Sequence, residues 1–278
     1  MLLSVLCGAA TALQWGLGAL ALRPVARAIP SHAFAFWFAA CNTVLLAVPA
    51  AILIADRGLS GRDLVIGLTA GAAEAAATVV YARALEAGEM VVVAPLVSLE
   101  GAVAAVIGII AGATIDITVG IGLFLCVAGG LGVGLPGGLN LHARGAGYAV
   151  LSAVFFGIML WLVGGTETNT VILVFLLSAF SGAALGIAYR SGLHPRAVPR
   201  RTQRFLLLAA LLNIGGLLAY SLGAHSGSLP VTAVLAAQFA VPAVIGGYLL
   251  HHERLNPSQL AGAVVLVVGV GLLVVNGQ

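Results

Sequence analysis

Two acidic residues, Glu74 and Glu100, lie near the middle of long apolar stretches, where an ionised side chain is costly unless it is paired or hydrated. Glu74 lies 14 residues before Gly88, and Glu100 lies 12 residues after it. If the chain turns at Gly88, a helical rise of about 1.5 Å per residue places them about 21 and about 18 Å from the turn, at nearly one depth. Two carboxylates close together in an apolar site are expected to share a proton.

Each acidic residue has an amide counterpart in the second half of the chain. Glu74 aligns with Asn213 and Glu100 aligns with Gln238, at offsets of 139 and 138 residues. Four polar residues therefore occupy equivalent places in two halves, acidic in one and amide in the other. Such a set predicts a substrate-binding site. The alternative is that a protonated Glu only joins neighbouring helices by a hydrogen bond.

Further polar residues follow the same helical faces. Tyr81 and Tyr220 lie seven residues beyond Glu74 and Asn213, which is two helical turns. Thr78 and Ser98 are additional candidates for substrate binding, although such hydroxyls often bond to their own backbone instead.

Pro242 interrupts an apolar run and frees a backbone carbonyl, so it is a candidate gating hinge or a simple tolerated kink.

The composition tells which elements hold these residues. Hydrophobic residues make up 61% of the chain and charged residues 8%, with a mean hydropathy of +1.14. A soluble domain carries about 25% charged residues. Lipid is therefore expected to be the main solvent, and the continuous runs of about 20 apolar residues predict helices and not barrel strands. Nucleic-acid binding is excluded as a function, because the twelve arginines lie almost entirely between apolar runs.

Ten apolar runs predict ten transmembrane helices in an all-α integral membrane protein. The connections between them are short, so we expect one compact bundle. The runs are 2–22, 30–54, 64–85, 91–111, 117–135, 146–164, 170–189, 205–223, 230–250 and 257–275.

An internal repeat divides the chain. The stretch 102–108 recurs as 240–246 with six matches in seven, and Trp15-Gly16 faces Phe156-Gly157. The sequence therefore predicts two five-helix repeats in one membrane domain, residues 1–139 and 140–278. Because five is odd, the second repeat must cross the membrane in the opposite sense. Inverted repeats are typical of secondary transporters, which bind substrate where the repeats meet.

The arginines predict an orientation. Ten of the twelve follow odd-numbered helices, and only Arg57 and Arg62 follow even-numbered ones. The positive-inside rule then places the 190–204 connection in the cytoplasm and both termini outside.

The second half resembles a known family. The segment 231–274 contains Pro242, Gly246, the turn His252-Glu253-Arg254-Leu255 and Gly262, and it resembles the second repeat of the EamA branch of the drug/metabolite transporter superfamily. His252 stands where that pattern has Gly.

The first repeat of the family is matched less well, with Ala104 at the expected Pro. The resemblance implies transport of metabolites, amino acids or drugs through a cavity lined by the third, fourth, eighth and ninth helices. It also implies cytoplasmic termini, against the arginine count.

Three other motifs are weaker. The glycines of 132–137 match a dinucleotide fingerprint, but no strand precedes them, so close helix packing is the better interpretation. His251-His252-Glu253 does not have metal-ligand spacing, and three isolated cysteines read as buried apolar residues. We expect no metal and no cofactor.

These patterns predict a multi-pass protein of the cell inner (plasma) membrane that transports a small-molecule solute, with protons as a possible second partner. We expect an exporter of metabolites, amino acids or amine-bearing compounds that works by alternating access. A proton-independent facilitator of neutral metabolites is the nearest alternative. An intramembrane enzyme is an alternative of another class, but the repeat argues against it, and we expect no enzymatic activity.

Overall fold

The structure is a computed structural model, and helices account for almost all of what it describes. The described residues are 2–87, 90–134, 145–167, 169–190, 197–239, 241–242 and 257–275. The helices are α1 (Leu2–Ala28), α2 (Ser31–Arg57), α3 (Gly61–Ala87), α4 (Met90–Val97), α5 (Glu100–Ile110), α6 (Ile117–Gly134), α7 (Ala146–Gly165), α8 (Thr170–Arg190), α9 (Arg200–His225), α10 (Leu229–Ala236), the short 3-10 helix η1 (Ala237–Phe239) and α12 (Pro257–Val275).

Local sequence explains where several helices begin and end. The α3 helix begins after a reciprocal cap, in which the Asp63 backbone N–H donates to Ser60 Oγ and the Ser60 N–H donates to Asp63 Oδ2, both at 3.1 Å. Gly58 ends α2 with a φ of 77°, a value that glycine adopts without strain. The α9 helix starts five residues earlier than its apolar run predicts, because Pro199 caps it and accepts from the Thr202 and Gln203 amides.

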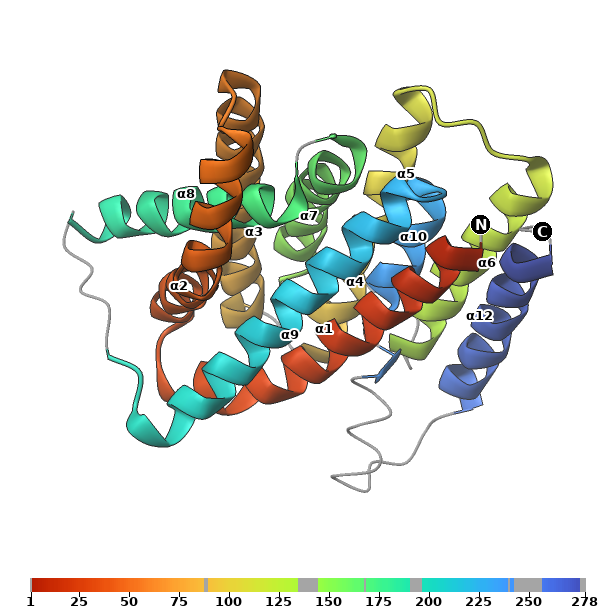
Figure 1. Ribbon diagram of the computed structural model, residues 1–278. Coiled ribbons are helices and arrows are strands. Elements are labelled where there is room, and N and C mark those ends of the chain that lie inside the picture. The colour runs from red at the N-terminus through yellow and green to blue at the C-terminus, as the bar shows by residue number, and fades with distance from the viewer. Residues whose placement is uncertain are drawn as a thin grey trace.

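The helices pack in pairs that are distant in sequence (Figure 1). The α1 helix lies along α9, and α6 lies along α12 at the other edge of the molecule. The α3 helix packs against α7 and α8, while α2 packs mainly against α8. Near the centre, α5 packs against α7 and α10.

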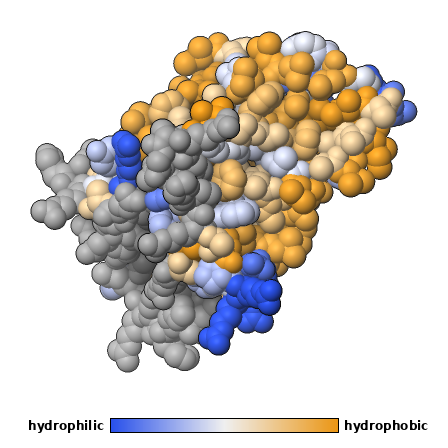
Figure 2. All heavy atoms as spheres, turned by 90° about the vertical axis from the view of Figure 1, so that its left-hand side faces the viewer, coloured by the Kyte–Doolittle hydropathy of each residue, from blue (hydrophilic) through white to orange (hydrophobic). Residues whose placement is uncertain are grey.

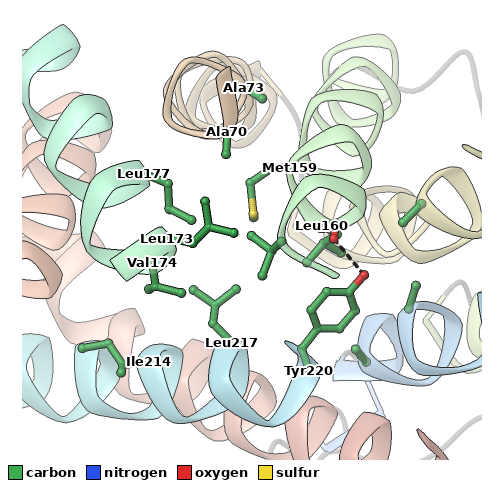
Figure 3. Close-up of a cluster of buried hydrophobic side chains, with 14 of the residues drawn as sticks. Ala70, Ala73, Met159, Leu160, Leu173, Val174, Leu177, Ile214, Leu217 and Tyr220 are labelled. Carbon is green, nitrogen blue, oxygen red and sulfur yellow. Dashed lines mark hydrogen bonds between the residues drawn. The ribbon is translucent and has the colours of Figure 1, made fainter. Parts of the chain in front are cut away.

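The largest apolar core cluster lies between α3, α7, α8 and α9 (Figure 3). Ala70 of α3, Leu160 of α7, Leu177 of α8 and Tyr220 of α9 are all fully buried in it. Small residues on α3 let the bulky side chains of α7 and α8 approach closely. This cluster holds α3, which carries Tyr81, and α9, which carries Tyr220, in place.

The outer surface is apolar. Large hydrophobic side chains such as Ile110, Ile117 and Phe124 are at least 71% exposed. Figure 2 shows one face on which hydrophobic residues cover most of the described surface and hydrophilic residues gather towards its ends. A surface of this kind suits lipid and not water.

Six of the described helices are long and apolar enough to cross a membrane, and four shorter apolar helices fall within the remaining predicted runs. The all-helical membrane class predicted from the sequence is confirmed.

Two of the predicted runs are broken and not continuous. The run 91–111 is divided into α4 and α5 by a tightened turn at Ser98 and Leu99, where the Leu99 N–H donates to the Leu96 carbonyl at 3.3 Å. The run 230–250 changes from α10 to η1 at Ala237, and its part from 243 onward lies outside the described residues. Pro242 explains the second break, because a proline cannot donate to the carbonyl four residues earlier, which here belongs to Gln238.

Candidate functional site

Glu100 is the first residue of α5, directly after the break between α4 and α5. Its side chain is 6% exposed. The carboxyl group lies close enough to Tyr81 of α3 and Tyr220 of α9 to interact electrostatically with both. A buried carboxylate near two tyrosines can attract a cation.

Tyr220 is held rigidly. Its side chain is fully buried, and its hydroxyl donates to the Leu160 carbonyl of α7 at 2.9 Å (Figure 3). The Trp15 ring of α1 stacks on the Tyr220 ring with centroids 6.5 Å apart, and it meets the Phe239 ring of η1 edge-on at the same distance. Trp15 thus contacts both Tyr220 and Phe239, which lies at the break in the run 230–250.

The Trp15 indole has an unused donor. Its Nε1 atom is buried and has no hydrogen-bond partner in the described part of the chain. An unpaired buried N–H is costly, so such atoms are rare in folded proteins. A solute with an acceptor group would satisfy this N–H. The sequence placed Trp15 in the repeat but did not identify it as a site residue.

Gln238 lies in η1, at the break that follows α10. Its side chain is 8% exposed, and its Nε2 donates to the Val234 carbonyl at 2.9 Å. The side-chain oxygen lies against Gly130 of α6, where a larger residue would collide with it. Gln238 therefore connects η1 to α6. It lies at the break after α10, just as Glu100 lies at the break between α4 and α5.

Each helix break is approached by a glycine of another helix. A Cβ atom at Gly157 of α7 would lie 2.8 Å from the Glu100 carbonyl oxygen and 2.6 Å from the Val103 Cβ. A Cβ atom at Gly16 of α1 would lie 2.8 Å from the Phe239 carbonyl oxygen and 2.7 Å from the Pro242 Cβ. Only glycine allows either approach. The predicted hinge residue Pro242 thus lies against α1.

The second carboxylate has different neighbours. Glu74 of α3 is 8% exposed, and its carboxyl group accepts a hydrogen bond from Ser181 of α8. Its Oε2 atom is buried and has no hydrogen-bond partner in the described residues. The sequence predicted that Glu74 and Glu100 lie at one depth, but it did not identify Ser181.

The remaining candidates are placed as follows. The Thr78 hydroxyl donates to the Glu74 backbone carbonyl at 2.8 Å, which is the local bond that threonine commonly forms in helices. Asn213 is half-buried in α9, and Ser98 is half-buried in the turn between α4 and α5. The weak metal motif at 251–253 lies outside the described residues. The part of the chain that the structure describes contains no cluster of metal-ligating side chains.

Comparisons with known proteins agree with this architecture. Residues 143–275 match the model of the EamA-like transporter family. In fold, the chain is similar to a solved structure described as "Crystal structure of protein", with a TM-score of 0.76 and 12% sequence identity; the match covers 98% of this chain and 97% of that one. At this identity the likeness shows the fold alone.

No curated protein matches the sequence. The family match nevertheless agrees with the apolar helices and with the motifs of the second half, and the structural likeness extends over the whole chain. Residues 143–275 form a domain of the EamA-like transporter family, within the drug/metabolite transporter superfamily.

Proposed function

We propose that the chain is a secondary transporter of the plasma membrane. It exports small metabolites, amino acids or amine-bearing compounds in exchange for protons, by alternating access. It carries out no chemical reaction on its solute.

The observation that carries this proposal is the group around Glu100. The Glu100 carboxyl group interacts electrostatically with Tyr81 and Tyr220, and Trp15 stacks on Tyr220. Aromatic faces and a negative charge together favour a cationic group, because the ring faces carry negative electrostatic potential. An amine-bearing solute fits this group better than a neutral one. Its acceptor atoms would satisfy the unused Trp15 N–H.

Alternating access requires two halves that move against each other, and we propose the repeats 1–139 and 140–278 for this role. The packing of the described helices supports the proposal. If each helix of the first repeat corresponds to the one five spans later, α1 corresponds to α7 and α3 corresponds to α9. The packing of α1 against α9 then has its counterpart in the packing of α7 against α3. Three other packed pairs each consist of a helix and its own counterpart in the other repeat: α2 with α8, α6 with α12, and α5 with α10.

Side-chain contacts support the same correspondence. Gly16 approaches the backbone at one helix break, and Gly157 approaches it at the other. Trp15 stacks on Tyr220, while Phe156 and Tyr81 belong to one apolar cluster.

The proposed substrate-binding site lies where the repeats meet. We propose Pro242 as its hinge, because it follows the break at η1 and packs against Gly16. The proposed solute-binding residues are Glu74, Glu100, Asn213, Gln238, Tyr81, Tyr220, Thr78 and Ser98.

The experiment is uptake of labelled amino acids, polyamines and quaternary amines by proteoliposomes, with and without a pH gradient. We expect uptake of at least one amine that responds to the gradient, and its loss in Glu100→Gln. Asp116→Asn removes a charge in the link before α6 and serves as the control. Uptake of neutral metabolites that ignores the gradient would favour the facilitator instead. Chemical conversion of a solute would favour an intramembrane enzyme.

A further inference from the structure

A second buried polar group lies on α2, α3 and α8, and it shares Glu74 with the proposed solute site. It consists of Asn42, Glu74, Ser178 and Ser181, whose side chains are 0 to 8% exposed. We call these four residues the polar layer. Asn42 and Ser178 have no place in the proposed solute site.

Two apolar clusters bracket the polar layer. On one side, Ala35 of α2 and Leu185 of α8 form a cluster against which Val79 of α3 packs. On the other side, Leu46 of α2 belongs to one cluster with residues 70 and 73 of α3 and residues 173, 174 and 177 of α8. The same three helices therefore meet above and below the layer.

Each member of the layer lies between these contacts along its own helix. Asn42 lies between Ala35 and Leu46, and Glu74 lies between residue 73 and Val79. Ser178 and Ser181 lie between residue 177 and Leu185. A hydrogen bond from Ser181 to Glu74 joins α8 to α3 within the layer. The four side chains thus lie in the segments of α2, α3 and α8 that the two apolar clusters bracket.

Most of the polar atoms in this layer have no partner. Asn42 Oδ1, Asn42 Nδ2, Glu74 Oε2 and Ser178 Oγ are buried and have no hydrogen-bond partner among the described residues. Because both atoms of the Asn42 amide are unpaired, exchanging its oxygen and nitrogen would not change this result. Of the six buried side-chain atoms that have no hydrogen-bond partner among the described residues, four belong to this layer, and this concentration indicates a missing occupant.

The chemistry of the layer identifies the occupant. Carboxylate, amide and hydroxyl oxygens are ligands of hard cations. Glu74 is the one charged residue in the segments 35–46, 70–79 and 174–185, which contain no Arg, Lys or His. One carboxylate balances one positive charge, so a monovalent ion fits and a divalent ion does not. The Asn42 N–H needs an acceptor, which a water molecule on the ion supplies.

We propose that the polar layer binds a monovalent cation, Na⁺, through the oxygens of Glu74, Asn42 and Ser178. Ser181 holds the Glu74 carboxyl group in position through its hydrogen bond. This inference does not depend on the solute proposed above, because it concerns the purified chain without any solute.

The test is Na⁺ binding by the full-length chain in detergent, measured as bound ²²Na⁺ and as the melting temperature in NaCl, KCl or choline chloride at one ionic strength. We expect saturable ²²Na⁺ binding and a higher melting temperature in NaCl. Glu74→Gln should weaken binding about tenfold or more, since it removes the charged ligand. Asn42→Leu removes both amide atoms at similar volume and should abolish the Na⁺ effect while the chain stays folded.

Ser178→Ala is the second variant, and it keeps the test valid if Asn42→Leu does not fold. Ser152→Ala is the matched control, because Ser152 is equally buried but donates to the Ala77 carbonyl at 3.0 Å outside the layer. It should keep the Na⁺ effect. Equal melting in NaCl and choline chloride without ²²Na⁺ binding would overturn the proposal and leave water as the occupant. Undiminished binding by Asn42→Leu and Ser178→Ala would overturn it as well.

Discussion

Replacing Gly157 by alanine tests how closely α7 approaches the start of α5. The added Cβ atom would lie 2.6 Å from the Val103 Cβ and 2.8 Å from the Glu100 carbonyl oxygen. Both distances are shorter than van der Waals contact, and the oxygen belongs to the backbone, which cannot rotate away. Overpacking of this kind costs about 1–3 kcal/mol. Alanine also improves the helix by about 0.5–1 kcal/mol, which leaves a net loss of about 0.5–2 kcal/mol.

The control is Gly271→Ala in α12, where nothing lies within 4 Å of the added atom. In this variant alanine stabilises the helix without any collision. The difference in stability between the two variants therefore measures the cost of the collision alone. Thermal unfolding in detergent measures both. A loss of 1 kcal/mol lowers the midpoint by about 2–4 °C in domains of 150–250 residues. A Gly157→Ala variant as stable as Gly271→Ala would refute the close approach, and with it the position assigned to Glu100.

Three further predictions concern a buried bond, a helix cap and the orientation. Tyr220→Phe removes the hydrogen bond to the Leu160 carbonyl and should destabilise the chain by about 0.5–1.5 kcal/mol in the same unfolding assay; an unchanged midpoint would contradict the bond. Ser60→Ala removes the cap of α3 and should cost about 0.5–2 kcal/mol, whereas no loss would mean that the cap adds nothing. In a background without the native cysteines, Leu59→Cys should react with an impermeant thiol reagent on intact cells and Ser191→Cys should not; the reverse pattern would place the termini in the cytoplasm.

The helices could be predicted from the sequence because each is a continuous apolar run of suitable length. The repeat also placed Tyr81 and Tyr220 at corresponding positions, and both interact electrostatically with Glu100. The breaks within the runs 91–111 and 230–250 could not be predicted. Ser98 and Leu99 carry no signal that ends a helix, and Pro242 gave equal support to a kink and a hinge.

Contacts between helices that are far apart in the sequence could not be predicted either. Counting residues from a turn gives a depth but not the helix that a side chain faces, so the Ser181 partner of Glu74 was missed. Asn42 is an ordinary polar residue in an apolar run. Only the packing of α2 against α8 shows that its amide is buried without a hydrogen-bond partner among the described residues.

The proposed coupling is tested most directly by proton movement in proteoliposomes that contain a pH-sensitive dye. Amine solute is added outside, at equal pH on both sides. The account predicts that wild-type protein takes up solute and releases protons from the interior, so that the interior becomes more alkaline. Glu100→Gln should give neither signal. Solute uptake without any change in internal pH, or an unchanged proton signal in Glu100→Gln, would contradict the account.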